Sequence, residues 1–102
     1  MNIFSEIPVD LQDEIFEDII KTDNLKIERI ISYGHTSPKT GWYESEQNEW
    51  VIVLKGQAIL SFESSEDVKL NAGDYINIVA FTKHKVSWTL PNAETIWLAI
   101  HY

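Results

Sequence analysis

The sequence predicts a single all-β domain, folded as a sandwich or barrel of about eight short strands. From residue 25 onward, short apolar and aromatic runs alternate with polar residues, as in strands with one buried face. Turn-forming residues interrupt these runs about every 8–12 positions. No helical pattern separates the strands, which argues against a parallel sheet built from βαβ units. A chain of 102 residues is the size of one domain with one core.

The N-terminal part carries the one helical pattern, over residues 9–22. Asp10 suits an N-cap, and Glu14 falls in the first turn, where the helix dipole favours negative charge. We therefore predict a short helix that packs outside the β domain or joins a dimer contact, with a helical arm at 1–24 and a β-barrel domain at 25–102. The apolar residues at helical spacing are Leu11, Ile15, Phe16, Ile19 and Ile20.

The rest of the chain is expected to alternate between strands and turns. Turn signals fall at 35–41, 44–48, 55–56, 63–67 and 91–92, where Gly, Pro, Asn, Ser and charged residues gather. The strands between them are expected at 27–33, 42–43, 50–54, 58–62, 68–70, 75–79, 84–90 and 95–102.

Composition excludes several classes of protein. Sixteen acidic against eight basic residues give a formal charge of −8, which should repel nucleic acids and anionic membrane surfaces. The absence of Cys excludes disulfides, zinc–thiolate sites and a cysteine nucleophile. No apolar run is long enough to span a membrane, and the first residues do not resemble a signal peptide. A cytoplasmic location is the expectation.

Two segments stand out as candidate site elements. The segment EWVIVLKG runs from Glu49 to Gly56, and the segment GDYINIVAFTKH runs from Gly73 to His84. Glu49 and His84 each begin an apolar strand, and strand alternation directs both side chains toward the interior. The sequence therefore places a carboxylate and an imidazole in the middle of the β domain.

These segments resemble the paired motifs of the cupin family, whose fold is a jelly-roll β-barrel of six to eight strands. Glu49 and Gly56 match the end of the first motif, and Gly73 and His84 match the second in position. The resemblance covers about residues 25–102 and is greatest to small stand-alone bacterial cupins. It implies a cupin-type barrel and a homodimer.

The usual cupin metal site is incomplete. Of its four ligands only Glu49 and His84 are retained. The two histidine positions of the first motif hold Trp42 and Glu44 in one register, or Tyr43 and Ser45 in the other. Glu44 could replace a histidine, or simply belong to an acidic turn.

The remaining candidates have competing roles. His84 is a metal ligand or a general base, or a core histidine bonded to a backbone carbonyl or to Glu49. Glu49 needs a metal or a hydrogen-bonding partner if buried, and otherwise forms an ion pair or lies at the surface. His35 and His101 are further candidate ligands for a divalent Fe, Mn, Ni or Zn ion. Tyr43 is a candidate proton donor.

Two main functions remain open on the sequence alone, beside a sugar-nucleotide isomerase-like cupin that would use His and Tyr and would need basic residues for the phosphates. In the first, the barrel binds a small organic molecule, with or without a divalent metal. An enzyme of this kind would be an oxygenase, isomerase or decarboxylase acting on a small metabolite. In the second, the protein is a metal-free binding, sensing or regulatory module without turnover. The fold itself does not choose between them.

Overall fold

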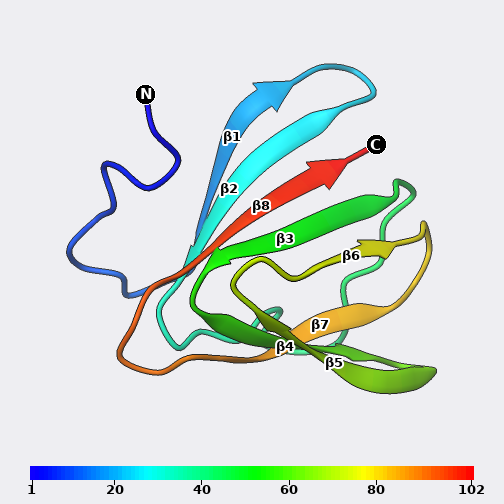
Figure 1. The fold of residues 1–102 in the computed structure, drawn as a ribbon. Coiled ribbons are helices and arrows are strands. Elements are labelled where there is room, and N and C mark those ends of the chain that lie inside the picture. Colours follow the sequence, from blue (N-terminus) through cyan, green and yellow to red (C-terminus); the bar gives the residue numbers. More distant parts are fainter.

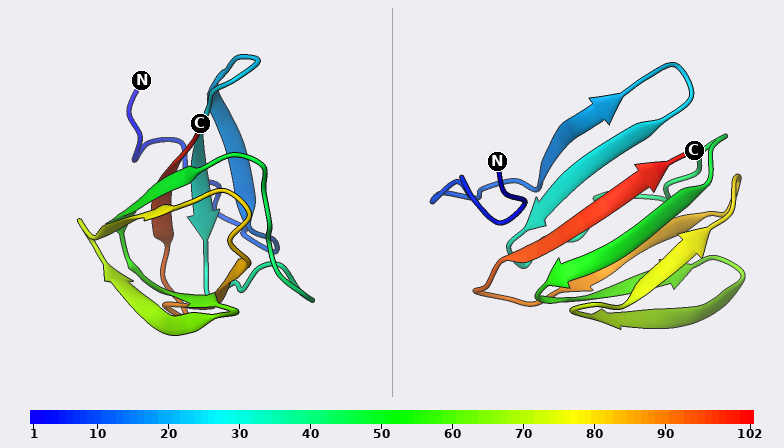
Figure 2. Two further views of the ribbon diagram at one scale, coloured as in Figure 1. Left: turned by 90° about the vertical axis from the view of Figure 1, so that its right-hand side faces the viewer. Right: turned by 45° about the horizontal axis from the view of Figure 1, so that its top comes forward.

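The computed structural model describes residues 1–102 as two antiparallel β-sheets that face each other (Figure 1). The five-stranded sheet has the order β1-β2-β8-β3-β6, and the three-stranded sheet has the order β5-β4-β7. Both views in Figure 2 show the larger sheet curving over the smaller one. The strands are β1 (Ile15–Lys21), β2 (Lys26–Ser32), β3 (Glu49–Lys55), β4 (Gln57–Phe62), β5 (Ser65–Asn71), β6 (Tyr75–Ile78), β7 (His84–Thr89) and β8 (Thr95–His101).

This arrangement confirms the predicted all-β barrel, with seven of the expected strands present. The strand expected at 42–43 is reduced to an isolated bridge between Tyr43 and His84, and the eighth strand is β1. Neighbours in the larger sheet come from distant parts of the sequence, since β8 lies between β2 and β3. Over the core, the inner faces of both sheets are apolar, so each covers the other from water. The structure has no helix of the length and apolarity that crossing a bilayer requires.

The predicted N-terminal helix is wrong, because β1 is an edge strand instead. Ile15–Lys21 pairs antiparallel with β2, with Ile15 opposite Ile31 and Lys21 opposite Lys26. The turn between them is closed by Thr22, whose amide donates to the Leu25 carbonyl at 2.7 Å. Isoleucines are β-branched and favour strands, and pairing with β2 satisfies the backbone along one edge. The helical spacing of the apolar residues was coincidental.

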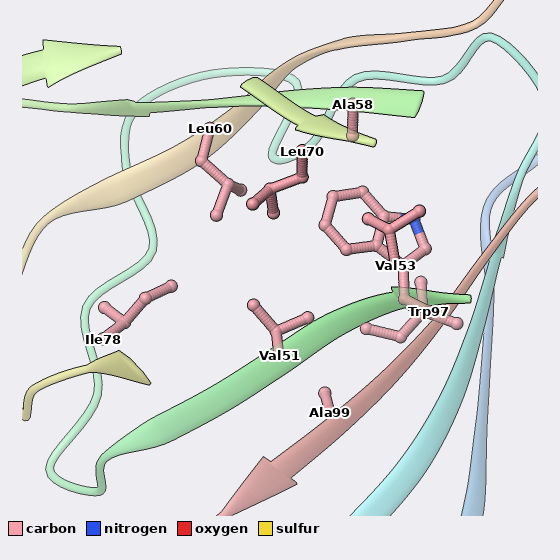
Figure 3. Close-up of a cluster of buried hydrophobic side chains, with 9 residues drawn as sticks. Val51, Val53, Ala58, Leu60, Leu70, Ile78, Trp97 and Ala99 are labelled. Atoms are coloured by element: carbon pink, nitrogen blue, oxygen red, sulfur yellow. The ribbon is translucent and has the colours of Figure 1, made fainter. Parts of the chain in front are cut away.

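The core lies between the sheets (Figure 3). Trp97 and Val53 point from the larger sheet toward Ala58 and Leu70 of the smaller one, and all four are almost fully buried. Trp97 is the largest fully buried side chain. The complete cluster comprises Ile30, Val51, Val53, Ala58, Leu60, Leu70, Ile78, Trp97 and Ala99.

Gly56 connects β3 to β4 where the backbone passes very close to β8. Its φ angle is +90°, and a Cβ atom there would lie 2.4 Å from Thr95 Oγ1 and 2.7 Å from the Glu94 carbonyl oxygen. Only glycine combines this conformation with this close approach. The glycine that ends the EWVIVLKG segment therefore closes the apolar end of the barrel.

Candidate functional site

Polar residues gather at the end of the barrel opposite Gly56, and the strand register explains why. Glu49 begins β3 and lies opposite His101, which ends β8. On the other side of β8, His101 lies opposite Lys26 at the start of β2. Glu28, two positions further along β2, lies on the same face as Lys26. His84 begins β7 in the facing sheet.

A cavity of about 470 Å³ lies at this polar end. Both sheets contribute to its walls, together with the segment from Tyr43 to Gln47 that crosses the end of the barrel. Its apolar floor includes Val51, Leu60 and Trp97, which join it to the core. A concave, largely apolar space with a few converging polar groups is the usual form of a small-molecule site.

Five side chains on the cavity wall form a continuous series of polar contacts, which we call the carboxylate–imidazole chain. It begins at His84, whose Nε2 lies 3.2 Å from Glu49 Oε1. Glu49 Oε2 lies 3.9 Å from His101 Nε2, which in turn lies 2.7 Å from Glu28 Oε1. Glu28 Oε2 lies 3.6 Å from Lys26 Nζ. Along this series, each carboxylate therefore lies next to an imidazole or an ammonium group.

His84 is held in one orientation by both of its ring nitrogens. Nδ1 lies 2.8 Å from the Thr82 carbonyl oxygen, which can only accept, so Nδ1 carries a proton. Nε2 faces the Glu49 carboxylate, and a hydrogen bond there needs a second proton. Burial lowers the pKa of His84, but the hydrogen bonds to Glu49 and Thr82 outweigh burial and leave the pKa above its usual value. The imidazolium form is thus stabilised.

Glu28 is buried at only 5% exposure, yet it is held as a carboxylate. Burial raises its pKa, but the hydrogen bond from His101 and the charge of Lys26 outweigh that effect, and the pKa falls below its usual value. Sequence analysis did not single out Glu28. Glu28 lies two positions from Ile30 on the same strand, so the two side chains share a face, and this spacing could have identified Glu28 as an inward residue.

Tyr43 lies beside His84 at the cavity wall. The two residues form a backbone bridge, with the Tyr43 amide donating to the His84 carbonyl at 2.8 Å, and their rings are 5.9 Å apart. Burial raises the pKa of Tyr43, nearby Glu14 and Glu49 raise it further, and a hydrogen bond with Ser37 offsets only part of this. The hydroxyl therefore stays protonated and can act as a donor.

Glu14 is a cavity residue that sequence analysis assigned to a helix. It precedes β1 and lies beside Ser32, whose hydroxyl donates to Glu14 Oε2. The Ser32 hydroxyl in turn accepts a hydrogen bond of 3.2 Å from the Trp97 indole. Glu14 Oε1 is buried and has no hydrogen-bond partner. Glu14 and Phe16, two positions apart, both line the cavity, but the run Glu-Ile-Phe-Glu at 14–17 does not alternate, so no local pattern indicates this inward orientation.

The predicted site residues are only partly brought together. Glu49, His84, His101, Tyr43 and the alternative ligand Glu44 all line the cavity. His35 does not. Its Nδ1 accepts from the Tyr33 amide at 2.8 Å, and its Nε2 lies 3.0 Å from the Gln12 carbonyl oxygen, so both nitrogens are used outside the cavity.

The residues as arranged do not fit a metal ion. No three His, Asp or Glu side chains form a group that could hold one. The imidazole nitrogens that would coordinate a metal face carboxylates instead, at 3.2 Å for His84 and 2.7 Å for His101. Cupin barrels often hold a metal through three histidines and a glutamate, and this chain lacks the two histidines of the first motif.

Two facing antiparallel sheets in a jelly-roll barrel are the architecture of cupins, among other families. A family model for the cupin domain matches residues 30–101, and the chain belongs to the cupin family. No curated protein matches the chain significantly.

Solved structures support the same fold. A protein from Ralstonia eutropha JMP134, named a "putative mannose-6-phosphate isomerase", is 41% identical with a TM-score of 0.93, covering 99% of this chain and 94% of its own. A cupin superfamily protein from Desulfitobacterium hafniense DCB-2 is 16% identical, with a TM-score of 0.77 over 93% of this chain and 82% of its own. An RmlC-like cupin from Methanocaldococcus jannaschii is 18% identical, with a TM-score of 0.74 over 94% and 85%.

Proposed function

We propose that this cupin binds a small polar molecule in the barrel cavity and exchanges a proton with it through His84 and Glu49. The observation that carries the proposal is the carboxylate–imidazole chain on the cavity wall. Buried charges are costly, and apolar side chains of similar volume would stabilise a barrel at least as well. A chain of titratable groups around a cavity is therefore better explained by a ligand than by stability.

The geometry of His84 suits proton transfer. Its Nδ1–H is committed to the Thr82 carbonyl, so the ring cannot rotate freely. The proton between Nε2 and Glu49 Oε1 is the one that can move, because those two atoms compete for it at 3.2 Å. A ligand atom within hydrogen-bonding distance of this pair would find a base and an acid side by side. The Tyr43 hydroxyl supplies a further donor on the same wall.

The name of the Ralstonia eutropha relative supports the same reaction class. An aldose–ketose isomerisation moves a proton from one carbon to its neighbour, with no net gain or loss of atoms. A base and an acid that share one proton are the chemical requirement for that step. We carry over the class of reaction, proton-transfer isomerisation of a small hydroxy-carbonyl compound.

The alternative function is a binding or sensing module without turnover. It uses the same cavity and the same contacts, and it differs in that no bond to carbon is broken. The distinguishing observation is exchange of a carbon-bound hydrogen of the bound molecule with solvent.

Binding is tested by NMR on the three histidines. D-mannose and D-fructose are titrated into the protein, and the imidazole Cε1–H signals are followed. We expect the signals of His84 and His101 to shift, while that of His35, outside the cavity, stays in place. Glu49→Gln should weaken binding about tenfold or more, since a hydrogen bond to a charged group is lost. Absence of any shift at His84 and His101 would overturn the proposal.

Turnover is tested in the same samples prepared in D₂O. Isomerisation by His84 and Glu49 should introduce deuterium at carbon 2 of mannose or carbon 1 of fructose, and Glu49→Gln should abolish this. Binding without deuterium incorporation would remove the proton-transfer part and favour the binding module.

A further inference from the structure

The cavity wall is strongly unbalanced in charge. Only one ammonium group, Lys26, lines it, and no arginine does. Lys26 is already paired with Glu28 at 3.6 Å, so its charge is largely neutralised. The four carboxylates that line the cavity are Glu14, Glu28, Glu44 and Glu49. Even with both imidazoles protonated, the cavity offers no uncompensated positive charge.

The wall is also unbalanced in hydrogen bonding. Ionised carboxylates only accept, and several donors around the cavity are used within the protein. On the wall, His101 Nε2 faces a carboxylate oxygen of Glu28, and behind the wall the buried Ser32 hydroxyl donates to Glu14. Glu14 Oε1 has no donor at all, although it is buried. An unsatisfied buried acceptor is costly, so Glu14 adds to the excess of acceptors around the cavity.

Glu14 and the carboxylate–imidazole chain reach the cavity from different elements. Glu14 precedes the edge strand β1, whereas Glu49 and His84 lie on β3 and β7. A bound molecule between them would therefore meet carboxylates from two directions. A phosphate or carboxylate group would bring more acceptors and more negative charge to a wall that already has both in excess.

We infer that the ligand of this cavity is a small molecule that presents hydroxyl or ammonium donors and carries no anionic group. The inference rests on the proposed function, since it concerns the ligand of the same site. It sets phosphorylated sugars apart from free sugars and amino sugars. Charged phosphate ligands are normally held by Arg, Lys or a helix N-terminus, and this cavity has only the paired Lys26.

The test compares three sugars of the same ring but different charge. D-mannosamine, D-mannose and D-mannose 6-phosphate are titrated at one ionic strength, below neutral pH where the amine is protonated. The imidazole signals of His84 and His101 report binding. We expect mannosamine to bind at least as tightly as mannose, and the phosphate to bind about tenfold or more weakly.

Two acidic residues of the same loop provide a matched pair of variants. Both are exposed, but Glu44 lines the cavity and Glu46 does not. Glu44→Gln should raise the affinity for mannose 6-phosphate relative to mannose, and Glu46→Gln should leave that ratio unchanged. Equal effects of the two variants would show that only overall charge matters and would overturn the inference.

The failures of the two proposals are distinguishable. If mannose 6-phosphate binds most tightly and shifts His84 and His101, the inference on ligand charge is overturned and the proposed site stands. If none of the three sugars shifts these two signals, the proposed function itself is overturned.

Discussion

Nε2 of His84 lies 3.2 Å from Oε1 of Glu49, although the residues are 35 positions apart in the sequence. His84 belongs to the three-stranded sheet and Glu49 to the five-stranded sheet. Their contact therefore joins the two sheets at the polar end of the barrel, as the Trp97 cluster joins them at the apolar end. The candidate site and the stability of the fold share this pair.

Stability should depend on pH through His84. Its pKa in the folded protein is raised above the ordinary value of 6.5, so its contribution is complete below about pH 6.5 and is lost as pH rises through the folded pKa. We expect the free energy of unfolding, measured in urea, to fall by about 1 kcal/mol between pH 6 and pH 8.5. Glu49→Gln should reduce this pH dependence, and Glu46→Gln should preserve it. An identical pH dependence in Glu49→Gln would contradict the pairing.

Stability at acid pH should depend on Glu28. Its pKa in the folded protein is lowered below 4.5, so its contribution is present above about pH 4.5 and is lost as pH falls through the folded pKa. His101→Ala removes the hydrogen-bond donor to Glu28 and should shift acid unfolding to higher pH. A midpoint of acid unfolding that does not move in His101→Ala would argue against this pair.

The two glycines at positive φ in the candidate segments should differ in their tolerance of alanine. Gly56 and Gly73 have φ angles of +90° and +92°, so both substitutions strain the backbone by about 1–2 kcal/mol. At Gly56 the new Cβ also meets Thr95 and the Glu94 carbonyl at 2.4–2.8 Å, whereas at Gly73 nothing lies within 4 Å. Gly56→Ala should therefore destabilise by at least about 2 kcal/mol more than Gly73→Ala in urea unfolding. Equal losses would show that this close approach is absent in solution.

Much of the barrel was predictable because its signals are local. Alternation places Glu49 with Val51 and Val53, and both valines are buried in the core as that pattern requires. The same rule places His101 with Trp97 on the inner face of β8. The turn at Gly56 is likewise encoded in its immediate neighbours.

The positions of Glu14, Glu28 and the N-terminal strand depend on long-range strand pairing, which one sequence does not reveal. Glu14 and Glu28 enter the cavity because β1, β2 and β8 pair in a particular register, with Ile15 opposite Ile31 and Glu28 opposite Ala99. No local pattern specifies which strand lies beside which. The N-terminal segment was misassigned for the same reason, because an edge strand gains its pairing from β2.

Metal ions should have little effect on this protein. Coordination would require His84 and His101 to leave the carboxylates that they face at 3.2 Å and 2.7 Å. Stoichiometric Zn²⁺, Mn²⁺, Fe²⁺ or Ni²⁺ should therefore change the melting temperature by no more than about 2 °C. A large rise with one metal that disappears in both His84→Ala and Glu49→Gln would instead establish a metal site at the polar end.

We propose that two copies of the chain associate as a homodimer through the β1 edge. Ile19 and Ile20 are 49% and 48% exposed on this edge strand, and Phe16 is 50% exposed. Unpaired edges with apolar side chains favour association with another strand or sheet. Sedimentation analysis should give a dimer for the natural chain and a monomer for the Ile19→Lys, Ile20→Lys double variant. Val79→Lys, at an exposed residue just after the opposite edge strand, is the control and should remain dimeric.

The NMR titration of the His84 imidazole in the natural protein and in Glu49→Gln tests the central claim most directly. The account predicts that His84 titrates above the ordinary histidine pKa of 6.5 in the natural protein, and that this pKa falls in Glu49→Gln. The Cε1–H signal of His35, whose contacts do not involve Glu49, should have the same chemical shift in both proteins at one fixed pH. An unchanged His84 titration in Glu49→Gln would contradict the carboxylate–imidazole chain on which the proposed site depends.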